Sequence, residues 1–182
     1  VQDTVVLSQP INPVVMETNV SHVSCYGGSD AEIGVYLDNG LLPYSFFIDG
    51  VQNPNPPPSD SLFSGLSAGV YVITGIDSDS CGVRDTIYID APLFPLQVLT
   101  SNAVTICDDS LSGVIYGYAA GGSPSVDDGY LFTWYNSSWG LLSSGDSISS
   151  LGIGDYFLEV TDSNGCQANQ AITISSQQVP LS

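Results

Sequence analysis

The sequence predicts an all-β fold made of tandem immunoglobulin-like antiparallel β-sandwich repeats. Apolar and polar residues alternate with a period of two along most of the chain, which is typical of half-buried strands. No stretch keeps a helical period for more than about one turn. Glycine, proline, asparagine and aspartate bound the alternating runs, so short turns join the expected strands. Many short strands with turns between them indicate two packed antiparallel sheets.

The expected strands fall into two matching sets, and the apolar residues of each run are expected to face inward. In the first set these residues are Ile33-Val35-Leu37, Tyr44-Phe46-Ile48, Tyr71-Ile73 and Ile87-Ile89. In the second set they are Val114-Tyr116-Tyr118, Tyr130-Phe132-Trp134, Tyr156-Leu158-Val160 and Ile172-Ile174.

Equal spacings show that one unit is used twice. Asp3 precedes Cys25 by as many positions as Asp85 precedes Cys107, and both aspartates begin an Asp-Thr-aliphatic triplet. Repeats of roughly 80 to 90 residues account for the length. Residues 1–13 are then expected to be the C-terminal strand and linker of a preceding repeat.

The two full repeats are expected at 14–94 and 95–182, the second with its following linker. Proline-bearing connectors such as Ala91–Leu96 are stiff, which favours an extended rod of neighbouring repeats in one chain. Prolines also predict an irregular loop at Asn53–Pro58, and extra residues predict another ahead of Tyr130.

The charge excludes several classes of function. The net charge is -18 and Arg84 is the single strongly basic residue, so the chain offers no surface for nucleic-acid phosphates. Anionic membranes would repel it. We also expect no direct membrane insertion, because no run of 18 apolar residues is present. Such a charge suits a soluble, secreted protein.

Four cysteines fall two per repeat. The simplest pairing joins Cys25 to Cys81 and Cys107 to Cys166, although three pairings are possible. On the chain-entropy model each bond would stabilise its repeat by roughly 4 kcal/mol. Such bonds persist in an oxidising compartment, so we expect an extracellular location.

Two recurring motifs have structural interpretations. Leu66, Gly69 and Tyr71, like Leu151, Gly154 and Tyr156, have the form of a tyrosine corner, in which the phenol donates a hydrogen bond to nearby backbone. The segments Asp77–Ser80 and Asp162–Gly165 are interpreted as turns. Their alternating carboxylates make Asp77, Asp79 and Asp162 weaker candidates for calcium ligands. No other cofactor is expected.

Catalysis is not expected. Gly65-Leu66-Ser67-Ala68-Gly69 matches the pattern of a serine nucleophile elbow, but a strand follows it where that motif needs a helix. The second repeat replaces the serine with Gly152, and the single histidine, His22, aligns with Val104. Trp139 in its polar loop could cover one end of a sandwich or stack on a sugar ring together with Asp127 and Asp128.

Three segments together resemble the SprB repeat of giant surface adhesins from gliding bacteria. Its pattern is similar to Gly40–Phe46, to Leu62–Tyr71 and to Thr161–Cys166 here. The second repeat departs by having Gly129-Tyr130 at the Pro-Tyr junction. The first departs at Ser80, where glycine is usual, and at Gly75-Ile76.

The resemblance implies a very large cell-surface filament that is exported by the type IX secretion system and moved by the gliding machinery. It would adhere to external polysaccharide or to solid surfaces. We therefore expect a structural or adhesive repeat segment. The alternatives are carbohydrate-binding units or an accessory region of a secreted polysaccharide-active protein.

Overall fold

The computed structural model of the chain describes residues 13–54, 61–101, 111–126 and 129–175, and contact clustering divides the chain into two units. The first unit runs to Val23 and continues from Gly28 to Asp90. The second takes everything described from Ala91 onward and also the segment Ser24–Gly27. The sequence predicted a boundary after residue 94. It did not predict that Ser24–Gly27, from within the first repeat, belongs to the second unit.

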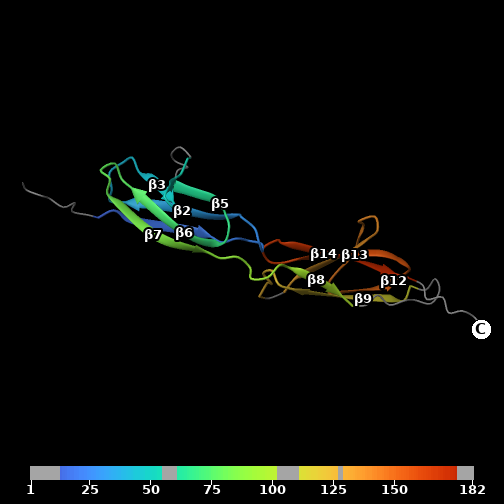
Figure 1. Cartoon of the computed structure of the whole chain (residues 1–182). Coiled ribbons are helices and arrows are strands. Elements are labelled where there is room, and N and C mark those ends of the chain that lie inside the picture. Colours follow the sequence, from blue (N-terminus) through green and yellow to red (C-terminus); the bar gives the residue numbers. More distant parts are fainter. Residues whose placement is uncertain (1–12, 55–60, 102–110, 127–128, 176–182) are drawn as a thin grey trace, which may run out of the picture. The chain divides into compact units, whose positions relative to one another are not determined.

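The first unit is a sandwich of two antiparallel sheets (Figure 1). The three-stranded sheet has the order β1 (Val15–Ser21), β2 (Ala31–Asp38) and β5 (Leu62–Leu66). The four-stranded sheet has the order β4 (Val51–Gln52), β3 (Ser45–Ile48), β6 (Gly69–Ile76) and β7 (Gly82–Ile89). Beyond the ends of β1 and β7, the N–H of Val23 donates to the Asp90 carbonyl at 3.0 Å.

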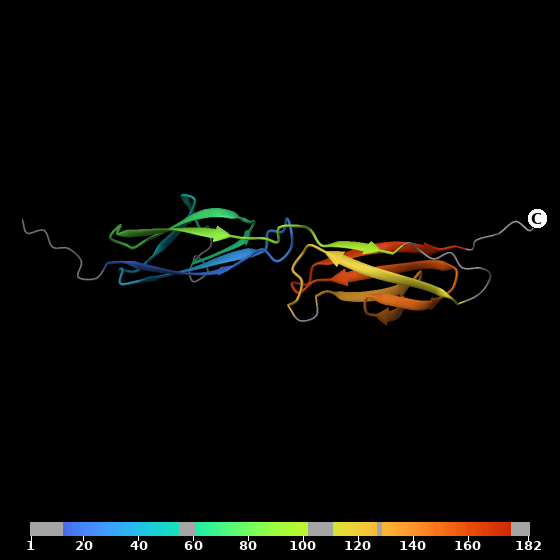
Figure 2. The same cartoon turned by 90° about the horizontal axis from the view of Figure 1, so that it is seen from below.

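The second unit, drawn in yellow-green to red in Figure 2, has the same strand order. Its three-stranded sheet consists of β8 (Gln97–Thr100), β9 (Gly113–Ala120) and β12 (Ser147–Leu151). Its four-stranded sheet has the order β11 (Leu141–Ser144), β10 (Leu131–Asn136), β13 (Gly154–Thr161) and β14 (Gln167–Ile174). The repeat seen in the sequence is therefore a repeat of the fold.

This distribution of strands is immunoglobulin-like. Counted along each unit, the first, second and fifth strands share one sheet, and the third, fourth, sixth and seventh share the other. The chain thus crosses from sheet to sheet between the second and third strands, between the fourth and fifth, and between the fifth and sixth. The first and last of these crossings are those of immunoglobulin sandwiches. The predicted fold class is confirmed.

Each unit has its own apolar core between its sheets, built from the alternate residues of facing strands. In the first unit Ile33, Val35 and Ile73 are fully buried. In the second unit the fully buried residues are Ile115, Trp134, Leu158, Val160 and Ile174. For seven of the eight predicted runs the face pointing inward is the predicted one.

The prediction for the remaining run, Val114-Tyr116-Tyr118, is wrong. Tyr116 and Tyr118 are 51% and 55% exposed. Ile115, which precedes Tyr116, is fully buried. The reason is lack of space beside β9. A Cβ atom on the inward Gly117 would lie 2.5 Å from Leu158 Cδ2 and 3.4 Å from Trp134 Cζ2. Larger side chains must therefore point outward.

The two units differ in side-chain size at two core positions, and Gly117 is at one of them. We call this pair of opposite changes in side-chain size the size exchange. Trp134 pairs with Leu158 in β13 as Ile48 pairs with Ile73 in β6, so tryptophan takes the place of isoleucine. Glycine at 117, where the first unit has a valine, makes room for the larger ring. Such compensation preserves core volume at native packing density.

Candidate functional site

The turn between β13 and β14 is held by one buried carboxylate. Asp162 is 7% exposed, and its Oδ1 accepts the N–H groups of Asn164 at 3.0 Å and Cys166 at 2.9 Å. Its Oδ2 accepts the N–H of Ser123 at 2.8 Å. Gly165 takes a positive φ of 82° to close the turn. This network fixes the backbone of Cys166.

The turn between β6 and β7 repeats this network in the first unit. Asp77 Oδ1 accepts the N–H groups of Asp79 at 3.0 Å and Cys81 at 2.8 Å. Asp77 Oδ2 accepts the N–H of Leu41 at 3.2 Å. Ser80 takes the positive φ, at 65°.

Two of the three calcium candidates therefore have backbone partners for their carboxylates. Asp77 and Asp162 each direct both carboxylate oxygens at N–H donors, which is the role of a turn anchor. Asp79 lies within the turn that Asp77 anchors. Within the described ranges, no three His, Cys, Asp or Glu residues come together to hold a metal ion.

A disulfide joins Cys166 to Cys25, with 5.7 Å between their Cα atoms. The predicted pairing of Cys25 with Cys81 and of Cys166 with Cys107 is therefore wrong. Cys81 is a free, exposed thiol. Cys107 lies outside the described residues.

The pairing follows from where the loop between β1 and β2 packs. Its segment Ser24–Gly27 belongs to the second unit. There the Ser24 carbonyl accepts a hydrogen bond from Asn164 Nδ2 at 2.9 Å and lies 3.4 Å from Cys166 Sγ. This contact places Cys25 against the Asp162 turn. The disulfide partner of Cys25 is therefore decided by the packing of this loop, and not by which cysteine lies in the same repeat.

Both tyrosine motifs form the hydrogen bond that their sequence pattern predicts. Tyr71 Oη donates to the Ser67 carbonyl at 3.0 Å, and Tyr156 Oη donates to the Gly152 carbonyl at 3.1 Å. Each bond returns to backbone at the corner where the chain passes from one sheet to the other. These residues are part of the scaffold of both units.

Trp139 lies in an aromatic cluster with Tyr135 and Phe157, two residues that the sequence analysis did not identify. Its ring stacks on Phe157, with centroids 4.8 Å apart and planes at 13°, and tilts against Tyr135 at 5.6 Å. The side chain is still 56% exposed. Tyr135 and Phe157 are neighbours in the β10–β13 register, on the face opposite Trp134 and Leu158. Both residues alternate with inward-facing ones in the sequence, and this pattern could have predicted that they share the outer face.

The backbone of Trp139 is in an unusual conformation. Its φ is 58°, a left-handed value that bulky residues rarely take. The turn is organised by Asn136, whose Oδ1 accepts the N–H groups of Ser138 and Gly140 at 3.0 and 2.8 Å. The strain is of the order of 1 kcal/mol, which contacts of the ring must offset.

Asp127 and Asp128, the predicted partners of Trp139, lie outside the described residues. Trp139 itself follows the C-terminal end of β10.

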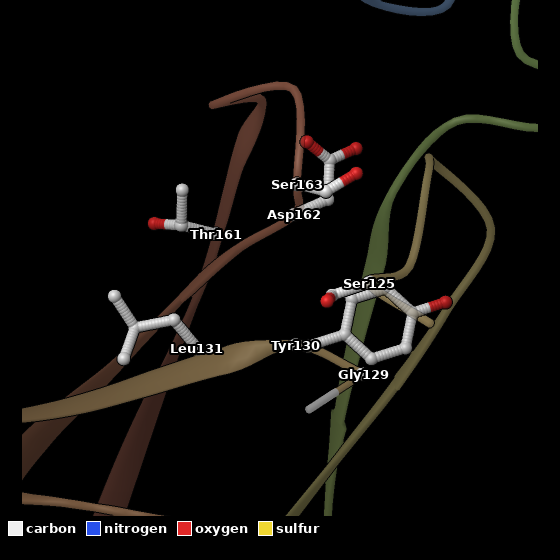
Figure 3. A pocket seen from close by; sticks show the side chains of 7 residues that line it. All are labelled: Ser125, Gly129, Tyr130, Leu131, Thr161, Asp162 and Ser163. Atoms are coloured by element: carbon white, nitrogen blue, oxygen red, sulfur yellow. The ribbon is translucent and has the colours of Figure 1, made fainter. Parts of the chain in front are cut away.

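A shallow pocket of about 360 Å³ lies at the N-terminal end of β10 (Figure 3). Leu131 and Thr161 form one wall and the Tyr130 ring the other. Tyr130 Oη is engaged with the Gly121 carbonyl at 2.8 Å, and the Asp162 carboxylate is occupied by its turn. The Tyr130 hydroxyl and the Asp162 carboxylate are therefore both engaged within the second unit.

Other sequence candidates for chemistry also have structural roles. The Gly65–Gly69 motif joins β5 to β6, so it lacks the helix that a nucleophile elbow requires. His22 Nδ1 accepts the N–H of Asp90 at 3.1 Å beyond the ends of β1 and β7. Across the described ranges, no helix is long and apolar enough to cross a membrane.

No family model and no curated protein matches the sequence. Solved structures are similar to it in fold. DIP-gamma IG1+IG2 has 12% identity, covering 92% of this chain and 99% of the other, with a TM-score of 0.43. The fibronectin(III)-like modules of Clostridium thermocellum CbhA have 14% identity over 93% and 96%, with a TM-score of 0.39.

The N-terminal eight Ig domains of Down Syndrome Cell Adhesion Molecule are also similar, at 13% identity and a TM-score of 0.42. The match covers 91% of this chain and 25% of that one.

Proposed function

We propose that the chain is a structural and adhesive repeat segment of a very large secreted cell-surface adhesin of the SprB type. In this proposal the repeats form a stiff, extended rod that serves surface adhesion and gliding motility. The type IX secretion system exports it, the gliding machinery moves it, and external polysaccharide or a solid surface is its target.

The main support for the proposal is that the features common to both units have structural roles. The Asp77 and Asp162 turns accept equivalent N–H groups, and the Tyr71 and Tyr156 corners bond equivalent carbonyls. The Asp77 and Asp162 carboxylates and the two phenol groups are all engaged with backbone. A unit repeated for its framework, with variable loops, suits a spacer more than a catalyst.

The disulfide and the charge support an extracellular place of action. A bond such as Cys25–Cys166 persists where the surroundings are oxidising. A net charge of -18 keeps a long exposed chain soluble and discourages association with like-charged surfaces.

Small-angle scattering of the full chain tests the rod. A compact globule of this length would have a radius of gyration of about 16 Å. The proposal predicts a clearly larger value that does not change with salt, because a stiff connector does not collapse when charge is screened. A compact particle, or one that contracts as salt is added, would contradict it.

The aromatic cluster supports a second candidate, a carbohydrate-binding unit within the same kind of secreted protein, including an accessory domain of a polysaccharide-active one. Trp139 is over half exposed although it is held in a strained conformation. Phe157 backs its ring, which leaves an aromatic surface suited to stacking on a sugar. The hydroxyl of Tyr135, 3.5 Å from Glu159 Oε1, adds polar groups nearby.

A glycan array and Trp139→Ala separate the two candidates. Binding that disappears in Trp139→Ala but persists in Tyr116→Ala, an exposed aromatic on β9, would establish the carbohydrate site. Absence of binding by the unaltered chain to every glycan would reject it and leave the spacer role.

A further inference from the structure

We propose that the Asp77–Cys81 turn is a docking site for a cysteine-bearing loop from another copy of this repeat, and that a disulfide to Cys81 completes the docking. The loop is of the Ser24–Gly27 type. The inference deepens the proposed function and rests on it for the presence of a further copy.

The second unit shows such a site in its occupied form. Its Asp162 turn presents Cys166, and the segment that covers it comes from the loop between the first and second strands of the preceding repeat. Asn164 Nδ2 donates both to the Ser24 carbonyl of that segment, at 2.9 Å, and to Ser123 Oγ, at 3.1 Å. Docking therefore combines a covalent bond with a side-chain hydrogen bond.

The first unit contains the same turn with a free thiol. The N–H of Asp77 donates to the Cys81 carbonyl at 2.9 Å, as that of Asp162 donates to the Cys166 carbonyl at 3.0 Å. Asp77 Oδ1 holds the N–H of Cys81 as Asp162 Oδ1 holds that of Cys166. The geometry that presents a bonded sulfur in one unit thus presents an exposed, unbonded one in the other.

The surroundings of Cys81 indicate what the docked loop must offer. Leu41, whose N–H and carbonyl both bond the turn, is 56% exposed, and Leu42 is 76% exposed. Asp79 stands where the second unit has the donor Asn164. An occupant should therefore cover apolar surface and present an N–H or O–H donor to the Asp79 carboxylate.

Formation of the bond requires an oxidant, which we take to be a low-molecular-weight or protein disulfide. The Cys81 thiolate attacks one sulfur of that disulfide, forms a mixed disulfide and releases one thiolate. The loop cysteine, as thiolate, then attacks the Cys81 sulfur and releases the second. Two protein thiols are oxidised to one disulfide, the reagent disulfide is reduced to two thiols, and both protons leave the protein thiols.

Joining two copies of the chain tests the site. If Met16 of the second copy directly follows Ser182 of the first, Cys107 of the first copy precedes Cys81 of the second by the 141 residues that separate Cys25 from Cys166. Cys81→Ser in the first copy and Cys107→Ser in the second leave a single Cys81 and a single Cys107, while Cys25 and Cys166 remain in both copies. The joined protein is refolded in a glutathione redox buffer and mapped under non-reducing conditions.

The expected product is a Cys81–Cys107 linked peptide from monomeric protein, and alkylation of Cys81 at least tenfold slower than in the single chain. The single chain is the matched control, because it contains the same two cysteines in the wrong order. Alkylation of Cys81 at equal rates in both proteins would overturn the proposal, as would a Cys81–Cys107 bond in both. The scattering result does not depend on this outcome, so failure of the disulfide and failure of the rod are distinguishable.

Asp77→Ala in the second copy tests the turn itself. Loss of the carboxylate removes the hydrogen bond to the Cys81 N–H, so the yield of linked peptide should fall several-fold. Asp38→Ala, at the exposed end of β2, is the matched control and should leave the yield unchanged. Equal yields from the two variants would show that the turn does not direct the bond.

Discussion

Cys81 and Cys166 end equivalent turns, yet Cys166 is bonded to Cys25 and Cys81 is an exposed free thiol. The two residues have the same backbone hydrogen bonds to an aspartate four positions earlier. Their difference therefore arises from what covers the turn. The loop segment Ser24–Gly27 covers that of Cys166.

The Cys25–Cys166 bond should stabilise the second unit. Cys25→Ser is expected to lower the free energy of unfolding of that unit by roughly 5 kcal/mol on the chain-entropy model, because the bond spans a sequence separation of 141. Urea unfolding, followed by a probe in each unit, measures this. Cys81→Ser is the control and should leave both transitions unchanged. An equal loss in the two variants would contradict the assignment.

Gly117→Ala should destabilise the second unit by about 1–3 kcal/mol, because the added methyl meets Leu158 and Trp134 in a filled core. The double variant Gly117→Val/Trp134→Ile reproduces the first unit at both positions and should recover part of that loss. Thermal unfolding measures both effects. If the double variant is the less stable of the two, the size exchange is not compensatory.

Tyr156→Phe removes a corner hydrogen bond and should cost about 1 kcal/mol of unfolding free energy. Tyr71→Phe should cost less, because its bond to the Ser67 carbonyl is exposed to water. Tyr118→Phe, on the outward face of β9, serves as the control. Chemical denaturation that finds Tyr156→Phe no worse than Tyr118→Phe would argue against a structural role for the corner.

Asp162→Ala should destabilise the second unit by roughly 3 kcal/mol, because three backbone N–H groups lose a charged acceptor. We expect these hydrogen bonds, and no metal ion, to supply the stabilisation. A chelator should therefore leave the melting temperature of the unaltered chain unchanged. A drop on chelation that calcium reverses would restore Asp77, Asp79 and Asp162 as ligands.

Local patterns in the sequence predicted much of the scaffold. Period-two alternation located the core strands, and the repeated Gly-x-Tyr spacing predicted both corners. The face of β9 was predicted wrongly because alternation alone does not distinguish Ile115-Gly117 from Tyr116-Tyr118 as the inward set. That choice depends on the size of Trp134 across the core, which is a tertiary property.

The candidate sites were less predictable. The disulfide partner of Cys25 depends on where the Ser24–Gly27 loop packs, and cysteine spacing within one repeat contains no such information. Trp139 was identified from its isolation in a polar loop. Its stacking on Phe157 depends on the β10–β13 register and on the left-handed turn at Trp139, neither of which the sequence pattern specified.

Disulfide mapping of the full chain tests the Cys25–Cys166 pairing most directly. A protease that cleaves at acidic residues suits a chain with 19 of them and one strongly basic residue. After alkylation of free thiols without reduction, we expect a linked peptide containing Cys25 and Cys166, and an alkylated Cys81. A linked peptide containing Cys25 and Cys81 would contradict both the pairing and the docking site built on it.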